Sequence, residues 1–484
     1  MIGNLPSDPH PWSERREAGL ANTTMRQTLG LVTRRFSVGK RRVFAEDPEQ
    51  EAARRLGVEA KRQAIANLDS LLDQFASKVR SNGGTALMAG TAHEAVEAVR
   101  SIAATHQVKV VVKSKSMLTE EIQLNRGLEA AGLTVLETDL GEYIIQRAHE
   151  TPSHILAPAA HKNRQQIREL FEDDAKTAGL APPVSDAAST LTQYARERLR
   201  REFLQADMGV TGGNFGVAET GTVVLVTNEG NADLVTTLPR VLVTVMGVEK
   251  LVARWEDLTL LIQQPAMNGI GQRLSAYTTL ISGPAASVAE GPAAWYVVLV
   301  DNGRQRLRHT VYEDVLSCIR CGACLNVCPV FRQVGGHAYG SVYSGPIGVV
   351  ETPLLTNFGV GAELPSVACT MCHACKEACP MEIDLPGHII RLRQEKVRRH
   401  LNAASLTASY HWWSRIWATP RGYRWSLRWA RRLQGLYQRQ GRLVRAPGIA
   451  RGWFQTRDMP PVAQETFIEW WQRHRGGLDR ERRS

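Results

Sequence analysis

The chain has eight cysteines, and all of them lie between residues 318 and 379. They form two copies of one pattern, in which three cysteines are separated by two-residue gaps and a fourth follows after three residues and precedes proline. The copies are Cys318, Cys321, Cys324 and Cys328, and Cys369, Cys372, Cys375 and Cys379. This pattern is typical of cysteines that hold [4Fe–4S] clusters.

The spacing also predicts which cysteines share a cluster. Two-residue gaps let three thiolates of one loop face a common centre, whereas the fourth thiolate, at the start of the next helical turn, is directed to the other cluster. We therefore predict two [4Fe–4S] clusters that exchange their fourth ligands. The first has Cys318, Cys321, Cys324 and Cys379, and the second has Cys369, Cys372, Cys375 and Cys328.

Two other interpretations of the cysteines stay open. Cysteine pairs at this spacing also bind zinc, but zinc sites use two pairs rather than two triplets that are each followed by Cys-Pro. Clusters can also serve only to hold a fold together. Two adjacent clusters with exchanged ligands allow an electron to pass from one to the other, which a purely structural cluster does not require. The pattern therefore favours electron transfer.

The rest of the chain predicts a large globular protein. Its 484 residues, 43% hydrophobic and 22% charged, suffice for two or three domains and exclude a disordered or collagen-like chain. The formal charge of +11 arises in residues 401–484, which hold 16 Arg, no Lys and five acidic residues. The N-terminal sequence lacks the apolar region of a secretory signal, and no segment is apolar enough to span a membrane. We expect a cytoplasmic protein.

Residues 46–300 alternate between helical and strand patterns. An amphipathic helix is predicted to about Arg80, and further helices begin at the capping box Thr91–Glu94 and span about 119–131. Alternation of this kind is typical of a parallel sheet covered by helices, so these residues predict one α/β domain. The predicted strands are 85–89, 108–112, 134–137, 222–227, 240–245 and 295–300. Residues 1–45 show no periodicity and are expected to be a loose extension.

Six motifs in this region are Val112–Met117, Glu137–Gln146, Pro152–Ile155, Gly209–Asn214, Ala218–Gly221 and Asn228–Asn231. Together they resemble the lactate utilisation protein B family. The resemblance covers about residues 46–400 and continues more weakly beyond. It implies a sheet domain related to CoA transferases and ribose-5-phosphate isomerase, followed by an α-helical dicluster ferredoxin domain. It also implies a role beside two partner subunits in oxidising L-lactate to pyruvate.

We therefore expect an iron–sulfur electron-transfer subunit, a component of an L-lactate-oxidising oxidoreductase, that passes electrons to an unknown acceptor. The alternative is a CoA-transferase-like or other acyl-handling enzyme with accessory clusters. The predicted divisions are an N-terminal extension (1–45), the α/β domain (46–300), the ferredoxin-like domain (301–400) and a basic Trp- and Arg-rich helical region (401–484).

The α/β domain contains candidates for binding a small molecule. Ligands of parallel sheets lie at the carboxyl ends of the strands, where lysines, small residues and amides could bind a carboxylate or phosphate. Tight turns explain the same residues equally well. The candidates are Lys113, Lys115, Thr211, Asn214, Asn228 and Asn231, and Glu219 is the candidate nucleophile of an acyl-transferring enzyme. We interpret His154 and His161 as core or capping histidines.

Eight of the eleven tryptophans follow residue 400 and are interleaved with arginine. A helix is predicted just past Pro420, with Trp425 and Trp429 one turn apart. Aromatic and Arg residues dominate protein interfaces, so docking on a partner subunit is the first interpretation. Contact with the inner face of the membrane is the second. Nucleic-acid binding is the least favoured, since no recognised motif accompanies the charge.

Overall fold

Six parallel strands form the main sheet in the computed structural model, which describes residues 5–47, 49–445, 453–454 and 457–481. The strand order is β1-β10-β7-β4-β2-β3. The central strands are runs of buried β-branched residues, as expected for a sheet covered on both faces. The strands are β1 (Thr85–Ala89), β2 (Val110–Lys113), β3 (Thr134–Glu137), β4 (Met208–Thr211), β7 (Val241–Gly247) and β10 (Ala294–Val300).

Successive side chains of each strand point to opposite faces of this sheet, and two different sets of elements cover them. Val111 packs in one core with α5 to α7, whereas Val112 packs in another with α8 to α10. Leu242 and Met246 of β7 contact α4 in a third core. The covering helices are α4 (Leu68–Ser81), α5 (Ala92–Thr105), α6 (Met117–Glu121), α7 (Leu124–Glu129), α8 (Leu140–Arg147), α9 (Arg164–Ala178), α10 (Ala188–Gln205) and α11 (Asn231–Thr237).

A second, four-stranded sheet was not expected from the sequence. Its order is β8-β5-β6-β9, and β6 is the strand predicted at 222–227. An apolar run predicts a strand but does not reveal which sheet the strand joins. The strands are β5 (Phe215–Val217), β6 (Thr222–Thr227), β8 (Leu251–Val252) and β9 (Tyr277–Ile281), with η1 (Val248–Lys250), α12 (Trp255–Leu261) and α13 (Gln264–Gly269) beside them.

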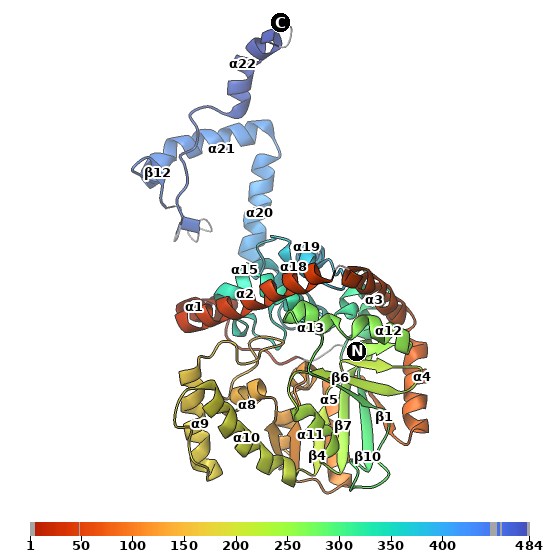
Figure 1. Cartoon of the computed structure of the whole chain (residues 1–484). Helices are drawn as coiled ribbons and strands as arrows, with labels where there is room; N and C mark the ends of the chain where they lie inside the picture. The colour runs from red at the N-terminus through yellow and green to blue at the C-terminus, as the bar shows by residue number, and fades with distance from the viewer. Residues whose placement is uncertain (1–4, 48, 446–452, 455–456, 482–484) are drawn as a thin grey trace. The chain divides into compact units, whose positions relative to one another are not determined.

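The N-terminal residues form helices, so the expectation of a loose extension is wrong. They are α1 (Trp12–Ala21), α2 (Thr23–Glu46) and α3 (Glu49–Ala66). Helix α2 lies against α13, α14 (Ala323–Val327) and α15 (Pro329–Val334) (Figure 1). Met25 and Leu29 are buried in the same core as residues of the cysteine region. The buried face of α2 is narrow and its sequence is Arg-rich, so its residues show no clear apolar periodicity.

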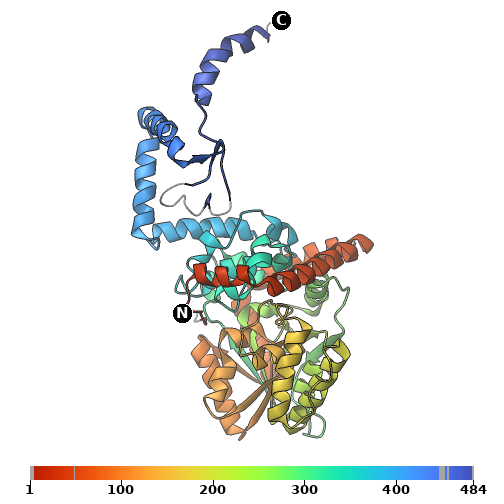
Figure 2. The ribbon, with the colours of Figure 1, turned by 90° about the vertical axis from the view of Figure 1, so that its left-hand side faces the viewer.

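Short helices connected by tight turns make up residues 301–396, the cysteine region. They share one apolar core with α2 and with the second sheet. Residues 1–396 accordingly form one compact unit (Figure 2). The elements are η2 (Gln305–Leu307), η3 (Glu313–Ser317), α14 (Ala323–Val327), α15 (Pro329–Val334), η4 (His337–Tyr339), α16 (Gly345–Leu355), α17 (Leu364–Val367), α18 (Ala374–Ala378) and α19 (Leu385–Arg398).

A separate unit begins at Val397. The predicted helix after Pro420 is present, with the Thr419 hydroxyl accepting the N–H of Gly422 as its cap. Neither α20 nor α21 buries a residue. Among the described residues no helix has the length and apolar character required to cross a bilayer. The unit contains α20 (Ala404–Trp417), α21 (Pro420–Leu433), η5 (Gln434–Tyr437), β11 (Gln438–Arg439), β12 (Arg442–Leu443) and α22 (Phe467–Glu481).

Candidate iron–sulfur centre and adjacent cavity

The two cysteine loops have the same backbone conformation. In the first gap of each loop, Arg320 and Met371 have positive φ values of 60° and 57°. In the second gap, Gly322 and His373 are left-handed N-caps of α14 and α18, with φ values of 69° and 63°. Because left-handed conformations are costly for residues other than glycine, their recurrence at matching positions indicates that the cysteine positions require them.

The structure brings the eight thiols together in two groups of four. Burial raises the pKa of Cys324, and the thiolates that raise it further are Cys318, Cys321 and Cys379. Burial also raises the pKa of Cys375 to about 12, and there the contributing thiolates are Cys328, Cys369 and Cys372. Helices α14 and α18, which carry the third cysteine of each motif, pack against each other. The exchange of fourth ligands between two clusters stays a prediction.

The chemistry of each group fits an iron–sulfur cluster. None of the eight cysteines forms a disulfide. Thiolates that share a site repel one another, and a cluster would supply the positive charge that relieves this repulsion. Backbone N–H groups point at the sulfurs, as when Phe331 and Met371 donate to Cys328 and Cys369 at 3.5 and 3.3 Å. A small cavity is lined by Cys328, Cys369, Cys372 and Cys375 together.

Basic side chains from outside the cysteine region contact the first group. The Lys40 ammonium on α2 donates to the carbonyl of Ala378 at 2.7 Å, next to Cys379. Burial lowers the pKa of Lys40, while the thiolates of Cys321 and Cys379 oppose that shift. Positive charge at this position stabilises an added electron.

A cavity of about 290 Å³ lies at the carboxyl ends of the main strands. The chain runs outward from β2 to β3 and returns through β4 to β7, so the sheet changes direction between β2 and β4. Open α/β sheets bind ligands at such a switch point. The segments after these two strands, 114–118 and 211–214, line the cavity on one side. Ile319 and Arg320, from the first cysteine loop, line it as well.

Five of the six predicted ligand residues line this cavity: Lys115, Thr211, Asn214, Asn228 and Asn231. No ion pair or hydrogen bond joins the Lys115 ammonium to another residue in the described part of the chain. The side chains of Asn214, Asn228 and Asn231 each make one hydrogen bond that shapes a turn or strand end. These three asparagines therefore line the cavity, where they could contact a ligand, and also stabilise local turns or strand ends.

Lys113 and Glu219 lie elsewhere. Lys113 is buried beside Glu137 at 2.6 Å and Glu120 at 2.9 Å. Burial opposes its charge, but these carboxylates outweigh burial and raise its pKa. Glu219 is exposed in the turn between β5 and β6, at the opposite end of this hairpin from Asn214. Its carboxylate accepts the N–H of Trp255, the first residue of α12, at 3.4 Å.

Sequence reasoning missed the residues on the cysteine side of the cavity. Lys250 follows β7, and its ammonium donates to the carbonyl of Cys318 at 3.4 Å. Arg320 pairs with Glu351 and lies over the Tyr343 ring, 4.4 Å from its centroid. Lys250 also follows the carboxyl end of a predicted strand, 240–245. The rule that ligands of parallel sheets bind at such ends therefore applies to Lys250 as well.

Two family models match separate stretches of the chain. Residues 72–300 match the LUD domain, and residues 314–383 match a 4Fe-4S dicluster domain. The protein is therefore a LUD-domain protein with a dicluster iron–sulfur domain.

Relatives that match almost the whole chain identify the family within this class of proteins. A protein of Oceanobacillus iheyensis named lactate utilization protein B is 41% identical over 471 residues, which cover 96% of this chain and 97% of that protein. Its namesake in Geobacillus kaustophilus is 42% identical over 471 residues, covering 96% and 98%. The chain belongs to the lactate utilization protein B family, and the resemblance seen in the motifs is confirmed. A crystal structure of a duf162 family protein from Deinococcus radiodurans aligns with 48% of this chain and 98% of its own, at 17% identity and a TM-score of 0.26.

Proposed function

We propose that the protein is the iron–sulfur electron-transfer subunit of a multi-subunit system that oxidises L-lactate to pyruvate. The relatives' name and the dicluster domain support this role. Oxidation of lactate to pyruvate releases two electrons and two protons, and two [4Fe–4S] clusters would accept one electron each. The observation that carries the proposal is the arrangement of eight thiols in two adjoining groups of four beside a cavity in the sheet domain.

The proposed ligands of the first cluster are Cys318, Cys321, Cys324 and Cys379, and those of the second are Cys369, Cys372, Cys375 and Cys328. In this assignment α14 and α18 hold the clusters side by side. Each helix is preceded by a residue in the left-handed conformation, which turns the cysteine loop toward its cluster. The surrounding lysines, Lys40 and Lys250, favour reduction by their charge.

We propose that the cavity binds a small carboxylate or phosphate. Lys115 supplies an unpaired positive charge, and Thr211, Asn214, Asn228 and Asn231 supply polar groups around it. The test is calorimetric titration of the anaerobic protein with L-lactate, pyruvate and inorganic phosphate. One of them should bind, and Lys115→Met should weaken it at least about tenfold, as expected for loss of a charged hydrogen bond. The matched control is Lys109→Met. Lys109 is exposed and directly precedes β2, and its replacement should not change the affinity.

We also propose that residues 401–484 dock on one of two partner subunits. Trp425 and Trp429 are 56% and 43% exposed on α21, and Trp412 on α20 is 69% exposed. Such rings, interleaved with arginines, are typical of interface hot spots. The same composition also suits an anionic membrane surface, which is the outcome that would replace partner docking.

The experiment for the main proposal is anaerobic purification followed by iron and sulfide analysis and a reductive titration. We expect about eight irons and eight sulfides per chain and reversible uptake of two electrons, as for two [4Fe–4S] clusters. Tightly bound zinc in place of iron, or clusters that are not reduced reversibly, would refute electron transfer.

A further inference from the structure

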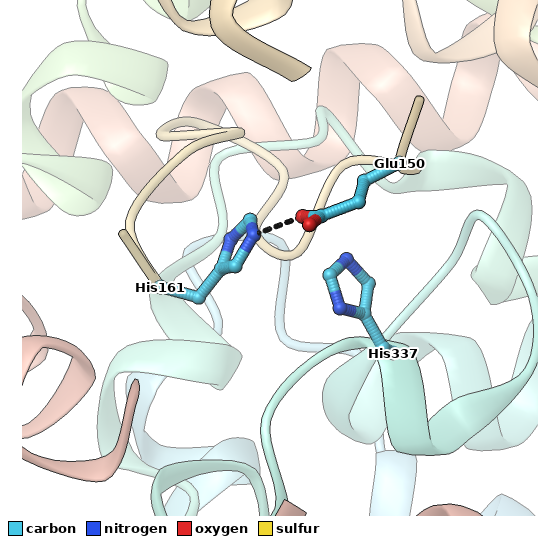
Figure 3. A group of neighbouring side chains, drawn as sticks. All are labelled: Glu150, His161 and His337. Atoms are coloured by element: carbon cyan, nitrogen blue, oxygen red, sulfur yellow. Dashed lines mark hydrogen bonds and ion pairs between the residues drawn. The ribbon is translucent and has the colours of Figure 1, made fainter. Parts of the chain in front are cut away.

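Three side chains outside the cysteine groups and the cavity converge on one point. Glu150 follows α8, His161 lies in the loop before α9, and His337 lies in η4 of the cysteine region (Figure 3). One ligand atom from each residue lies within 4.8 Å of the other two. Among the described residues no other three His, Cys, Asp or Glu side chains have ligand atoms this close together, and 176 positions separate the two histidines in the sequence.

Hydrogen bonds fix which nitrogen of His161 carries its proton. The Ser153 hydroxyl donates its hydrogen to the carbonyl of Pro158 at 3.0 Å, so this oxygen can only accept from the ring. His161 Nδ1 lies 2.8 Å from the Ser153 oxygen and must be the donor. In the neutral ring, Nε2 then carries a lone pair. That nitrogen lies 2.6 Å from a carboxylate oxygen of Glu150, and the two atoms point toward each other (Figure 3).

His337 is held in a complementary way. Its Nε2 lies 2.7 Å from the carbonyl of Thr151, which can only accept, so Nε2 carries the proton and Nδ1 is left with a lone pair. The centroids of the His161 and His337 rings are 4.7 Å apart, and the ring planes meet at 75°.

Each ligand is therefore oriented by a partner behind it. The Lys162 ammonium binds the second oxygen of Glu150 at 2.7 Å, which leaves the first oxygen directed at His161. An imidazole whose outer N–H is anchored, and a carboxylate whose outer oxygen is anchored, are the usual supports of a metal ligand.

We propose that Glu150, His161 and His337 bind one divalent first-row transition-metal ion, such as Zn²⁺. Two imidazoles and one carboxylate are ligands that Zn²⁺ and Fe²⁺ both accept, and three protein ligands leave a coordination position for water. Glu150 is 36% exposed, so this position opens to solvent. The ion links the loop 148–163 of the sheet domain to the segment that follows α15, and so fastens the cysteine region to the sheet domain.

The test uses the full chain with its clusters intact, so that free thiols do not compete. After a chelator wash, titration with Zn²⁺ should show one site per chain beyond the iron. His161→Ala and His337→Ala should each abolish it, and Glu150→Gln should weaken it. Ser153→Ala should lower the affinity about 10- to 100-fold, because it removes only the support behind His161. His93→Ala, an exposed histidine on α5, is the control and should bind as the unmodified protein does.

Unchanged iron content in each variant shows that the chain has folded. Absence of saturable Zn²⁺ binding by the unmodified protein would overturn the proposal and leave His161 hydrogen-bonded to Glu150. Equal binding by the unmodified protein and both alanine variants would also overturn it, since the ion would then bind elsewhere.

Discussion

Lys250 donates to the backbone carbonyl of Cys318 at 3.4 Å, and the same lysine lines the cavity at the strand ends. One side chain thus contacts both the first cysteine loop and the space in which we propose that an anion binds. Burial lowers the pKa of Lys250, which the adjacent Glu249 partly opposes. A ligand and a cluster on either side of this ammonium would affect each other through its charge.

Replacing this lysine should make the first cluster harder to reduce. Lys250→Met removes a buried positive charge, and we expect a more negative reduction potential by an amount on the order of 1 kcal/mol, or tens of millivolts. Potentiometric titration followed by electron paramagnetic resonance measures the shift. Lys78→Met, an exposed lysine on α4, is the control. Equal potentials in the Lys250 variant and the unmodified protein would show that Lys250 does not act on the cluster.

The exchange of fourth ligands can be tested with pairs of cysteine variants. Cys328→Ser and Cys369→Ser are assigned to one cluster, so the double variant should lose about four irons, no more than either single variant. Cys328→Ser and Cys318→Ser are assigned to different clusters and together should cost about eight. Iron analysis of anaerobically purified variants measures both. The opposite pattern would mean that each motif holds its own cluster.

His154 should make the protein sensitive to acid. Its ring is buried between the Leu156 N–H, at 3.0 Å from Nδ1, and the Asn326 side chain, at 3.2 Å from Nε2. Burial lowers its pKa from 6.5 to about 4. Below pH 6.5 the unfolded chain binds a proton that the folded one excludes, so stability is lost as the pH falls from 6.5 toward 4, by up to about 3 kcal/mol.

The variant His154→Gln should lack this pH-dependent contribution to the free energy of unfolding. Apparent unfolding temperatures, recorded anaerobically at one scan rate across this pH range, should fall less steeply in the variant than in the unmodified protein. Parallel curves would show that His154 is not the group responsible.

The tail should bind a partner through its indoles. Trp425→Ala and Trp429→Ala together should weaken co-purification with the partner subunits at least about tenfold, as expected for hot-spot residues. Iron content should not change, because the tail belongs to a different compact unit from the cysteines. Arg439→Ala, outside α21, is the control. If the double variant instead loses binding only to anionic vesicles, the surface contacts lipid rather than protein.

The sequence was sufficient for local features and for the family. The strand at 85–89 and the helix after Pro420 follow from local pattern and caps. The assignment of the cysteines to two clusters stays a prediction. Features that depend on tertiary pairing could not be predicted. The hairpin that carries Glu219 away from the cavity is set by the pairing of β5 with β6, and Lys113 is removed from the site by carboxylates on other segments.

The same limit explains the histidines. His161 was interpreted as a core or capping residue, and nothing in its neighbourhood along the chain points to His337. Only the packing of the loop before α9 against η4 brings the two rings together.

The most direct test of the electron-transfer role is spectroscopic. The protein is co-purified anaerobically with its partner subunits from the native host, and L-lactate is added while the cluster absorbance and paramagnetic signals are recorded. The account predicts that lactate reduces the clusters, and that it does so only when the partners are present. Clusters that dithionite reduces but lactate, with partners present, leaves oxidised would contradict it.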